Sequence, residues 1–142
     1  MIVVDASVAA KWFLPEADSE AAGRLLTGRR KLLAPDLIRV EVAAAITRRA
    51  RLGELTEGQA RTLVAAWTRA VARGVVTPVA APGDFDGAVE LALQLRHPLQ
   101  DCFYLALARR LAVPLVTADR TFAKRARTVH PQTEELWAET GG

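Results

Sequence analysis

The chain has 142 residues, of which 51% are hydrophobic and 25% are charged. This length suits one domain, over residues 1–142, and the apolar fraction excludes a disordered tail. No stretch approaches the roughly 18–20 apolar residues of a membrane span, and Asp5 and Lys11 interrupt the apolar start, which excludes a signal peptide. Cys102 is the single cysteine, interpreted as a buried packing residue, so a disulfide or a cysteine-based zinc site is excluded. We expect a cytoplasmic protein with no membrane contact.

Basic residues outnumber acidic ones by 19 to 16, which gives a formal net charge of +3. Sixteen of the 19 are arginines, whose flat guanidinium binds phosphate through two parallel hydrogen bonds. The arginine bias fits a polyanionic partner, and it fits equally well a chain encoded by GC-rich DNA.

Short β-rich runs alternate with longer helical ones in the first half of the chain. Strands are predicted at Ile2–Asp5 and Leu32–Pro35, and helices over Ala6–Leu14 and Asp18–Thr27. Asp36 is expected to cap a long helix that runs to about Leu52. Thr56 and Gln59 form a capping box, which predicts a further helix through Arg73.

The same alternation continues to residue 130. The pattern predicts, in order, a strand over Val75–Val79, a helix from Asp84 or Asp86 to about Arg96, a helix over Gln100–Ala112, a strand over Pro114–Thr117, a short helix over Arg120–Arg127 and an edge strand at Thr128–His130. Strands separated by helices imply parallel βαβ units. The predicted fold class is therefore α/β, with helices on both faces of the sheet.

Two acidic residues follow strands. Asp5 ends the first strand, and Asp119 comes just after the strand that ends at Thr117. Ligands of open parallel sheets collect at this edge, beyond the carboxyl ends of the strands. The alternatives are a turn or cap acid for Asp5, and the N-cap of the helix that begins at Arg120 for Asp119. Ser7, two residues after Asp5, is by itself best explained as a helix N-cap.

Two further acids lie on the apolar side of predicted helices. Glu41 shares a face with Leu37 and with alanines one turn later, where an unpaired carboxylate is costly to bury. Either Arg39 or Arg48 pairs with it, or a cation does. Asp101 lies in the first turn of its helix, on the stripe that faces the core; the helix dipole alone accounts for its position but not for its inward direction.

These four carboxylates are expected to meet, because strand ends and the starts of the following helices share one edge of a parallel sheet. Their mutual repulsion requires cations, and oxygen-only ligands favour Mg²⁺ or Mn²⁺ over zinc. Without these four, the 19 basic residues face 12 acids, a charge of +7. A basic surface around an acidic metal site suits a phosphodiester substrate.

Other notable side chains have ordinary structural explanations. His97 and His130 each precede a proline and have no ligand-like spacing, so both are interpreted as loop residues. Phe13 is expected in the core. Trp12 and Trp67 belong either to the core or to an interface with a partner.

Four motifs, taken together, resemble those of the PIN-domain ribonucleases, and more narrowly the VapC-type toxins of bacterial toxin–antitoxin pairs. They are Val-Asp-Ala-Ser at 4–7, the helical Glu41, Asp-Cys-Phe-Tyr-Leu-Ala-Leu-Ala at 101–108, and Leu-Val-Thr-Ala-Asp-Arg-Thr-Phe at 115–122. The resemblance covers Asp5 to Phe122. It implies a three-layer α/β/α fold with a central parallel sheet of four or five strands.

The resemblance also implies an activity and a site. The activity is Mg²⁺- or Mn²⁺-dependent hydrolysis of RNA, leaving 5′-phosphate and 3′-hydroxyl ends. The site would comprise catalytic and metal-binding acids together with polar residues that orient them through hydrogen bonds. The acids are Asp5, Glu41, Asp101 and Asp119, and the polar residues are Ser7 and Thr117.

Basic side chains near these acids are candidates for binding RNA. The segment directly after Asp119 ranks first, because it holds four basic residues and no acid: Arg120, Lys124, Arg125 and Arg127. A second group on the helix of Glu41 comprises Arg48, Arg49 and Arg51. The alternative for each is an ordinary solvated side chain.

The family resemblance implies particular partners. These are a second copy of the chain in a homodimer, and a VapB-type antitoxin whose C-terminal segment covers the groove. Operator DNA would be bound only through the complex with the antitoxin.

Three other classes of protein are alternatives to this family. A haloacid-dehalogenase-like phosphatase needs a second aspartate where this chain has Ser7, and a receiver domain needs an adjacent acidic pair and a late lysine, which are missing. A non-catalytic module that binds nucleic acid or a partner would explain the basic charge, but gives no reason for four acids to meet. Metal-dependent RNA cleavage distinguishes the nuclease from this module.

Overall fold

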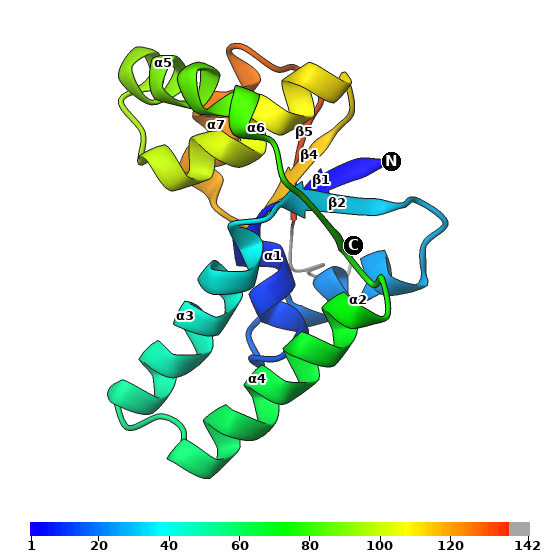
Figure 1. Cartoon of the computed structure of the whole chain (residues 1–142), viewed down its shortest axis with the longest axis vertical. Helices are drawn as coiled ribbons and strands as arrows, with labels where there is room; N and C mark the ends of the chain where they lie inside the picture. The colour runs from blue at the N-terminus through cyan, green and yellow to red at the C-terminus, as the bar shows by residue number, and fades with distance from the viewer. Residues whose placement is uncertain (137–142) are drawn as a thin grey trace.

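The computed structural model describes residues 1–136, and a five-stranded parallel sheet lies at its centre (Figure 1). The spatial order of the strands is β3-β2-β1-β4-β5. Their bounds are β1 (Ile2–Val4), β2 (Leu32–Pro35), β3 (Thr77–Val79), β4 (Leu115–Thr117) and β5 (Thr133–Glu135).

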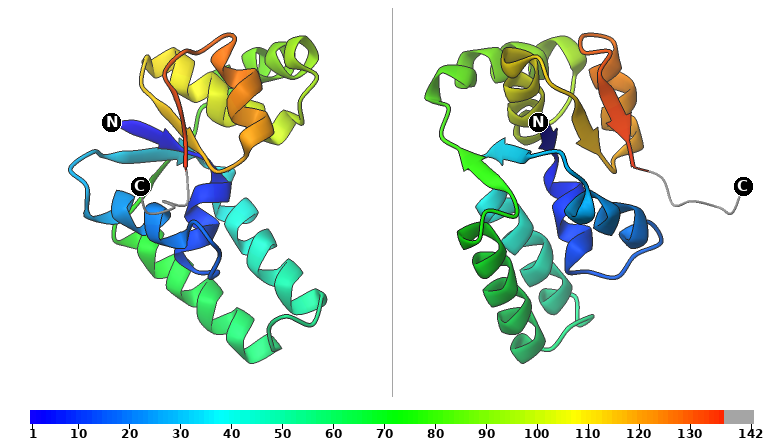
Figure 2. Two further views of the ribbon diagram at one scale, coloured as in Figure 1. Left: turned by 180° about the vertical axis from the view of Figure 1, so that it is seen from behind. Right: turned by 90° about the vertical axis from the view of Figure 1, so that its right-hand side faces the viewer.

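Helices cover both faces of this sheet, which confirms the three-layer α/β/α fold (Figures 1 and 2). One layer holds α1 (Ala6–Ala9), the 3₁₀ helix η1 (Ala10–Trp12), α2 (Ser19–Thr27), α3 (Ile38–Arg51) and α4 (Glu57–Ala72). The other holds the 3₁₀ helix η2 (Pro82–Asp84), α5 (Phe85–Leu95), α6 (Leu99–Leu111) and α7 (Arg120–Arg127).

The direction of travel through the sheet explains this division. The chain moves from β1 to β2 to β3, then returns past β1 to form β4 and β5 on its other side. Right-handed crossovers place the helices of the first part on one face and those of the second part on the other. The neighbouring strands β1 and β4 therefore lead to helices on opposite faces, α1 and α7, and open sheets bind ligands at such a switch point.

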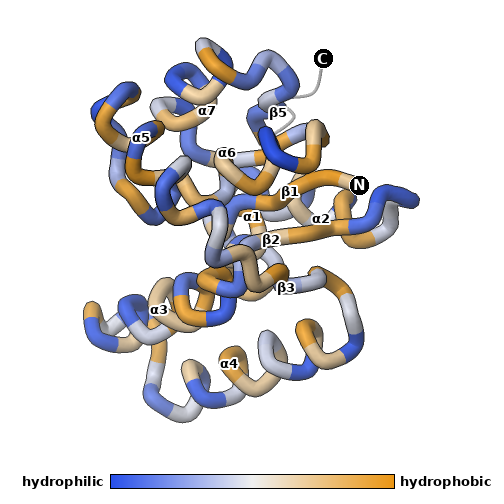
Figure 3. Tube along the Cα trace, turned by 45° about the horizontal axis from the view of Figure 1, so that its top comes forward, coloured by the Kyte–Doolittle hydropathy of each residue, from blue (hydrophilic) through white to orange (hydrophobic). Residues whose placement is uncertain are grey.

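The core is continuous through the sheet. All three residues of β1 are fully buried, as expected for a strand covered on both faces, and β1 and β2 are hydrophobic along their length (Figure 3). Helix α6 packs across β1 and β2, and its Leu105, Leu107 and Ala108 are fully buried. Each buried leucine contributes about 1.5–3 kcal/mol, so α6 is firmly held where it carries Asp101.

Most predicted elements are present, and the capping box is confirmed. Thr56 Oγ1 accepts from the Gln59 backbone N–H at 3.0 Å, and the Thr56 N–H donates to Gln59 Oε1 at 2.9 Å. The N-cap assigned to Asp36 is wrong: Leu37 holds that position, and the Asp36 carboxylate accepts from Arg39 Nε at 3.1 Å. No helix within residues 1–136 combines the length and apolar character of a membrane span.

The edge strand predicted at Thr128–His130 is also wrong. The backbone N–H groups of Val129 and His130 both donate to the Ala126 carbonyl, so these residues close the end of α7 as a turn. The edge strand is instead β5, where Thr133 lies opposite Leu115. Residues 128–132 connect α7 to β5, because a parallel strand must return to the start of its neighbour before pairing.

Candidate metal centre

Asp5 lies directly after β1, at the switch point of the sheet. Its backbone N–H donates to the Val116 carbonyl at 2.9 Å, and its side chain is only 3% exposed. Two hydroxyls donate to the same oxygen, Oδ2: Ser7 Oγ at 2.6 Å and Thr117 Oγ1 at 2.9 Å. The carboxylate is therefore fixed in orientation, with Oδ1 left for another partner.

Ser7 and Thr117 join the turn after β1 to the turn after β4. Ser7 Oγ also accepts from the Ala118 backbone N–H at 3.0 Å, and Thr117 Oγ1 accepts from the Asp119 N–H at 3.1 Å. Ser7 lies inside α1, whose N-cap position is Asp5, so the N-cap explanation of Ser7 is wrong. These contacts connect the backbone of Asp119 to the carboxylate of Asp5.

Asp119 and Asp101 approach the same point from two helices. Asp119 is the N-cap of α7, because its Oδ1 accepts from the Phe122 N–H at 3.0 Å. Asp101 lies in the first turn of α6, with Oδ2 2.6 Å from His97 Nε2. One ligand atom from each of His97, Asp101 and Asp119 lies within 4.8 Å of the others.

Glu41 comes to the site from α3. Its Oε1 is buried and has no hydrogen-bond partner within residues 1–136. Neither expected arginine pairs with it, since Arg39 contacts Asp36 and no ion pair of Arg48 is found in that range. The Tyr104 hydroxyl is also buried without a hydrogen bond of good geometry within residues 1–136, but it lies near enough to Glu41 to lower the pKa of that carboxyl.

The charges of Asp5, Glu41 and Asp119 are each coupled to Asp101. Burial raises the pKa of Asp5 to about 7, and the charges of Asp101 and Glu41 add to the rise, against the two hydroxyl donors. Burial also raises the pKa of Asp101, which Asp119 raises further and His97 lowers. Burial raises the pKa of Glu41, and so does the charge of Asp101, against the Tyr104 hydroxyl. Such perturbed groups are typical of functional sites.

A divalent cation fits this donor set. Apart from the His97 contact, none of the ion pairs found in residues 1–136 involves one of the four acids. The unpartnered Glu41 Oε1 and the elevated pKa of Asp5 are the consequences of burying like charges without a counterion. A cation among them would remove both.

The contact of His97 with Asp101 was not predicted from the sequence. His97 does lie in a loop, but it is only 7% exposed and contacts Asp101. The four-residue spacing between His97 and Asp101 was the available signal, because the helix that carries Asp101 begins between them. His130 is equally buried, but its Nε2 contacts a backbone carbonyl, that of Val113 at 2.8 Å, and not a carboxylate.

The basic residues after Asp119 differ from one another in the structure. Arg120 and Arg127 both pair with Glu135, and the half-buried Arg125 points inward to His97. Lys124 is exposed, with no ion pair found in residues 1–136.

On α3 the basic residues also divide. Arg49 pairs with Glu16 and Glu54, whereas Arg48 and Arg51 are exposed.

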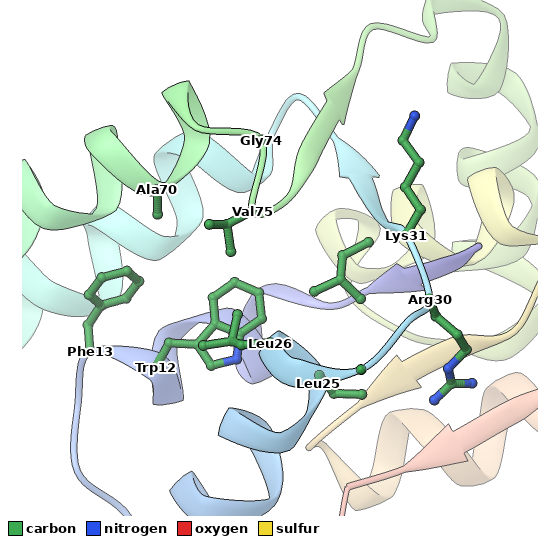
Figure 4. A pocket seen from close by; sticks show the side chains of 11 residues that line it. Trp12, Phe13, Leu25, Leu26, Arg30, Lys31, Ala70, Gly74 and Val75 are labelled. Atoms are coloured by element: carbon green, nitrogen blue, oxygen red, sulfur yellow. The ribbon is translucent and has the colours of Figure 1, made fainter.

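The two tryptophans have different roles. Trp67 is 2% exposed, donates from Nε1 to the Arg39 carbonyl at 3.1 Å and packs edge-on against Phe13, so it belongs to the core. Trp12 lines a pocket of about 480 Å³. Figure 4 shows it beside Leu26 and Val75.

Comparisons with known proteins agree with the geometry. The PIN domain pattern matches residues 2–128. The chain is 34% identical to Ribonuclease VapC3 of Pyrobaculum aerophilum over 125 residues, 87% of this chain and 93% of that protein. It is 31% identical over 133 residues, 94% of this chain and 97% of the relative, to both VapC ribonuclease Mb0985 of Mycobacterium bovis and Ribonuclease VapC9 of Mycobacterium tuberculosis. The chain therefore belongs to the PIN-domain family, in its VapC-type group.

Proposed function

We propose that the protein is a metal-dependent endoribonuclease and the toxin of a toxin–antitoxin pair, hydrolysing RNA to 5′-phosphate and 3′-hydroxyl ends. One observation carries this proposal: Asp101 and Asp119 lie in one cluster, Asp5 and Glu41 are coupled to Asp101 electrostatically, and the buried Glu41 Oε1 has no hydrogen-bond partner within residues 1–136. A fold has no structural reason to bury uncompensated negative charge, whereas a site for metal and phosphate does.

Mg²⁺ or Mn²⁺ is the expected cofactor, because the acidic donors are all oxygens. The residues proposed to hold it are Asp5, Asp101, Asp119 and Glu41. Bound there, the ion would lower the pKa of water and offset the charge of the phosphate under attack.

The neighbouring hydroxyls have a separate role in this proposal. Ser7 and Thr117 both donate to Asp5 Oδ2, which keeps that oxygen occupied and the carboxylate in one rotamer. Thr117 is fully buried, so its hydroxyl also excludes water from behind the carboxylate. These two residues orient Asp5 and do not need to touch the RNA.

Exposed basic side chains would bind the RNA backbone near the site. A cavity of about 550 Å³ is lined by Ser7, Lys11 and Arg48, among others. Lys11 pairs with Glu16 and Asp18, which leaves Arg48 to contact phosphate there. Exposed Lys124, on the helix that Asp119 caps, is a second candidate. Each phosphate contact makes binding more salt-dependent.

We also propose a VapB-type antitoxin as partner. The pocket lined by Trp12 has exposed apolar side chains, Leu26 and Val75, with Arg30 and Lys31 on the segment that leads into β2 (Figure 4). This combination suits an apolar anchor on an acidic segment. We propose a homodimer as well, as the resemblance to VapC-type toxins implies, and operator DNA would be bound only through the antitoxin complex.

Total bacterial RNA provides the test. The wild type, Asp5→Asn and Asp101→Asn would be incubated with it in Mn²⁺, Mg²⁺ or EDTA, and the product ends mapped by sequencing. We expect discrete cuts with 5′-phosphates in the wild type with metal, and none in EDTA or in either variant. Asp86→Asn is the matched control, since Asp86 is an exposed acid on α5 and its loss changes the net charge equally.

Two outcomes would contradict the proposal. Folded, antitoxin-free wild type that cuts no RNA with any metal would favour a non-catalytic binding module. Cutting that persists in Asp5→Asn would place the chemistry elsewhere.

A further inference from the structure

His97 makes an unusually complete set of contacts for a loop residue. Its Nε2 lies 2.6 Å from Asp101 Oδ2, and its Nδ1 lies 3.0 Å from Arg125 Nη1. Its ring stacks on Phe122, with the centroids 4.7 Å apart and the planes 15° from parallel. The side chain is 4% exposed, so these contacts form in the interior of the protein.

The backbone explains how the ring enters the interior. Arg96 ends α5 in the left-handed conformation, with φ 52°, and Pro98 then precedes the first turn of α6. The chain reverses between the two helices, and His97 lies at the reversal. The Arg96 carbonyl accepts from the same Arg125 Nη1 at 3.0 Å, which fixes the guanidinium beside the ring.

The contacts determine which ring nitrogen carries the proton. Arginine has only donors, so Nδ1 must supply a lone pair to Arg125. Nε2 then carries the hydrogen and donates it to Asp101 Oδ2. Both nitrogens are thereby occupied, and neither has a lone pair left for a metal ion.

We propose that His97 is a positioning residue that orients the Asp101 carboxylate toward the cation site. The donor holds Oδ2, and Oδ1 is the oxygen left for a cation. The ring also rests on Phe122, whose backbone N–H holds Asp119 Oδ1, so His97 fixes the spacing between two acids on α6 and α7. Hydrogen-bonding partners of ligating carboxylates typically contribute 10–100-fold to metal affinity. The inference rests on the proposed function where it concerns catalysis, whereas the effect of His97 on metal binding is measured without RNA.

Mn²⁺ binding without RNA is the primary test. His97→Phe keeps an aromatic ring against Phe122 and removes the donor, so we expect Mn²⁺ to bind about 10–100-fold more weakly by calorimetry. His97→Gln keeps an N–H near the Nε2 position and should recover most of the affinity. His130 is the matched control: it is equally buried, and His130→Phe should lower the melting temperature but leave Mn²⁺ affinity unchanged.

Arg125→Met is a second variant in case His97→Phe does not fold. It removes the guanidinium that fixes the ring, and several-fold weaker Mn²⁺ binding is expected. In RNA cleavage, His97→Phe should lower kcat and leave KM nearly unchanged, because the substrate is bound by cations elsewhere.

Pulsed electron paramagnetic resonance separates positioning from ligation. The wild-type Mn²⁺ complex should show no directly bound nitrogen. A ¹⁴N coupling that disappears in His97→Phe would make His97 a ligand and overturn the proposal. Unchanged Mn²⁺ affinity in His97→Phe, or equal losses in His97→Gln, would overturn it too. Wild type whose Mn²⁺ affinity falls as expected in His97→Phe, but which cuts no RNA, would refute only the ribonuclease function.

Discussion

Replacing Asp5 by asparagine should make the metal-free protein more stable at neutral and alkaline pH. The carboxyl has a pKa of about 7 in the folded protein, against an ordinary value of 3.8. Between these values the native state binds more protons than the unfolded state, so stability falls as pH rises. At pH 8 the raised pKa of Asp5 lowers the free energy of unfolding by about 4 kcal/mol relative to its value at acidic pH. About 3 kcal/mol of this loss occurs between pH 5 and pH 8.

Asparagine fits the site with little rearrangement. Its side-chain oxygen can accept the hydrogen bonds that Ser7 and Thr117 donate to Asp5 Oδ2, and an amide N–H replaces the second carboxylate oxygen. The amide does not ionise, so the pH dependence from this residue disappears. The elevated pKa values of Glu41 and Asp101 act in the same direction, so part of the pH dependence will remain.

Urea unfolding in EDTA at pH 5, 6, 7 and 8 measures this effect. We expect Asp5→Asn to exceed the wild type by a few kcal/mol at pH 8 and by less at pH 5, and Mn²⁺ to stabilise the wild type more than the variant. Asp86→Asn should stay within about 1 kcal/mol of the wild type at every pH, because Asp86 is exposed. Wild-type stability that is flat or rises from pH 5 to pH 8, or a less stable Asp5→Asn, would show that burial of the Asp5 carboxylate does not cost stability.

Three other substitutions test separate parts of the structure. Thr117→Val removes a buried donor to Asp5 and should lower stability by about 1–3 kcal/mol, more at pH 8 than at pH 5, in the same urea titrations. Lys124→Glu should weaken RNA binding and reduce its salt dependence, measured by fluorescence anisotropy from 50 to 200 mM salt; an unchanged slope removes Lys124 from the RNA path. Trp67→Phe loses the hydrogen bond to the Arg39 carbonyl and leaves a void beside Phe13, so it should lower stability by about 1–3 kcal/mol, and a thermally neutral variant would contradict its place in the core.

Local signals in the sequence predicted most of the fold. The box formed by Thr56 and Gln59 begins α4 because its two hydrogen bonds are made within four residues. The buried run Ile2–Val4 is apolar without alternation, as a parallel central strand requires. The prediction failed at Thr128–His130, because the position of an edge strand depends on the length of chain needed to return to its neighbour, which no local pattern encodes.

Part of the candidate site's arrangement could also be predicted. Strand ends and helix starts share one edge of a parallel sheet, and Asp101 lies close to Asp119 and interacts electrostatically with Asp5 and Glu41. That these four acids form the functional site stays a prediction. The family itself was recognisable from the order of the motifs, and the PIN domain match over residues 2–128 confirms it.

Which side chains contact one another depends on the tertiary structure. Arg125 looked like its basic neighbours, but the fold turns it toward His97, while Lys124 one residue earlier is exposed. His97 looked like a loop residue, and its contact with Asp101 depends on the turn between α5 and α6. The reason is physical: backbone order follows from local hydrogen bonds and hydrophobic pattern, whereas charge pairing and burial depend on distances between segments far apart in the chain.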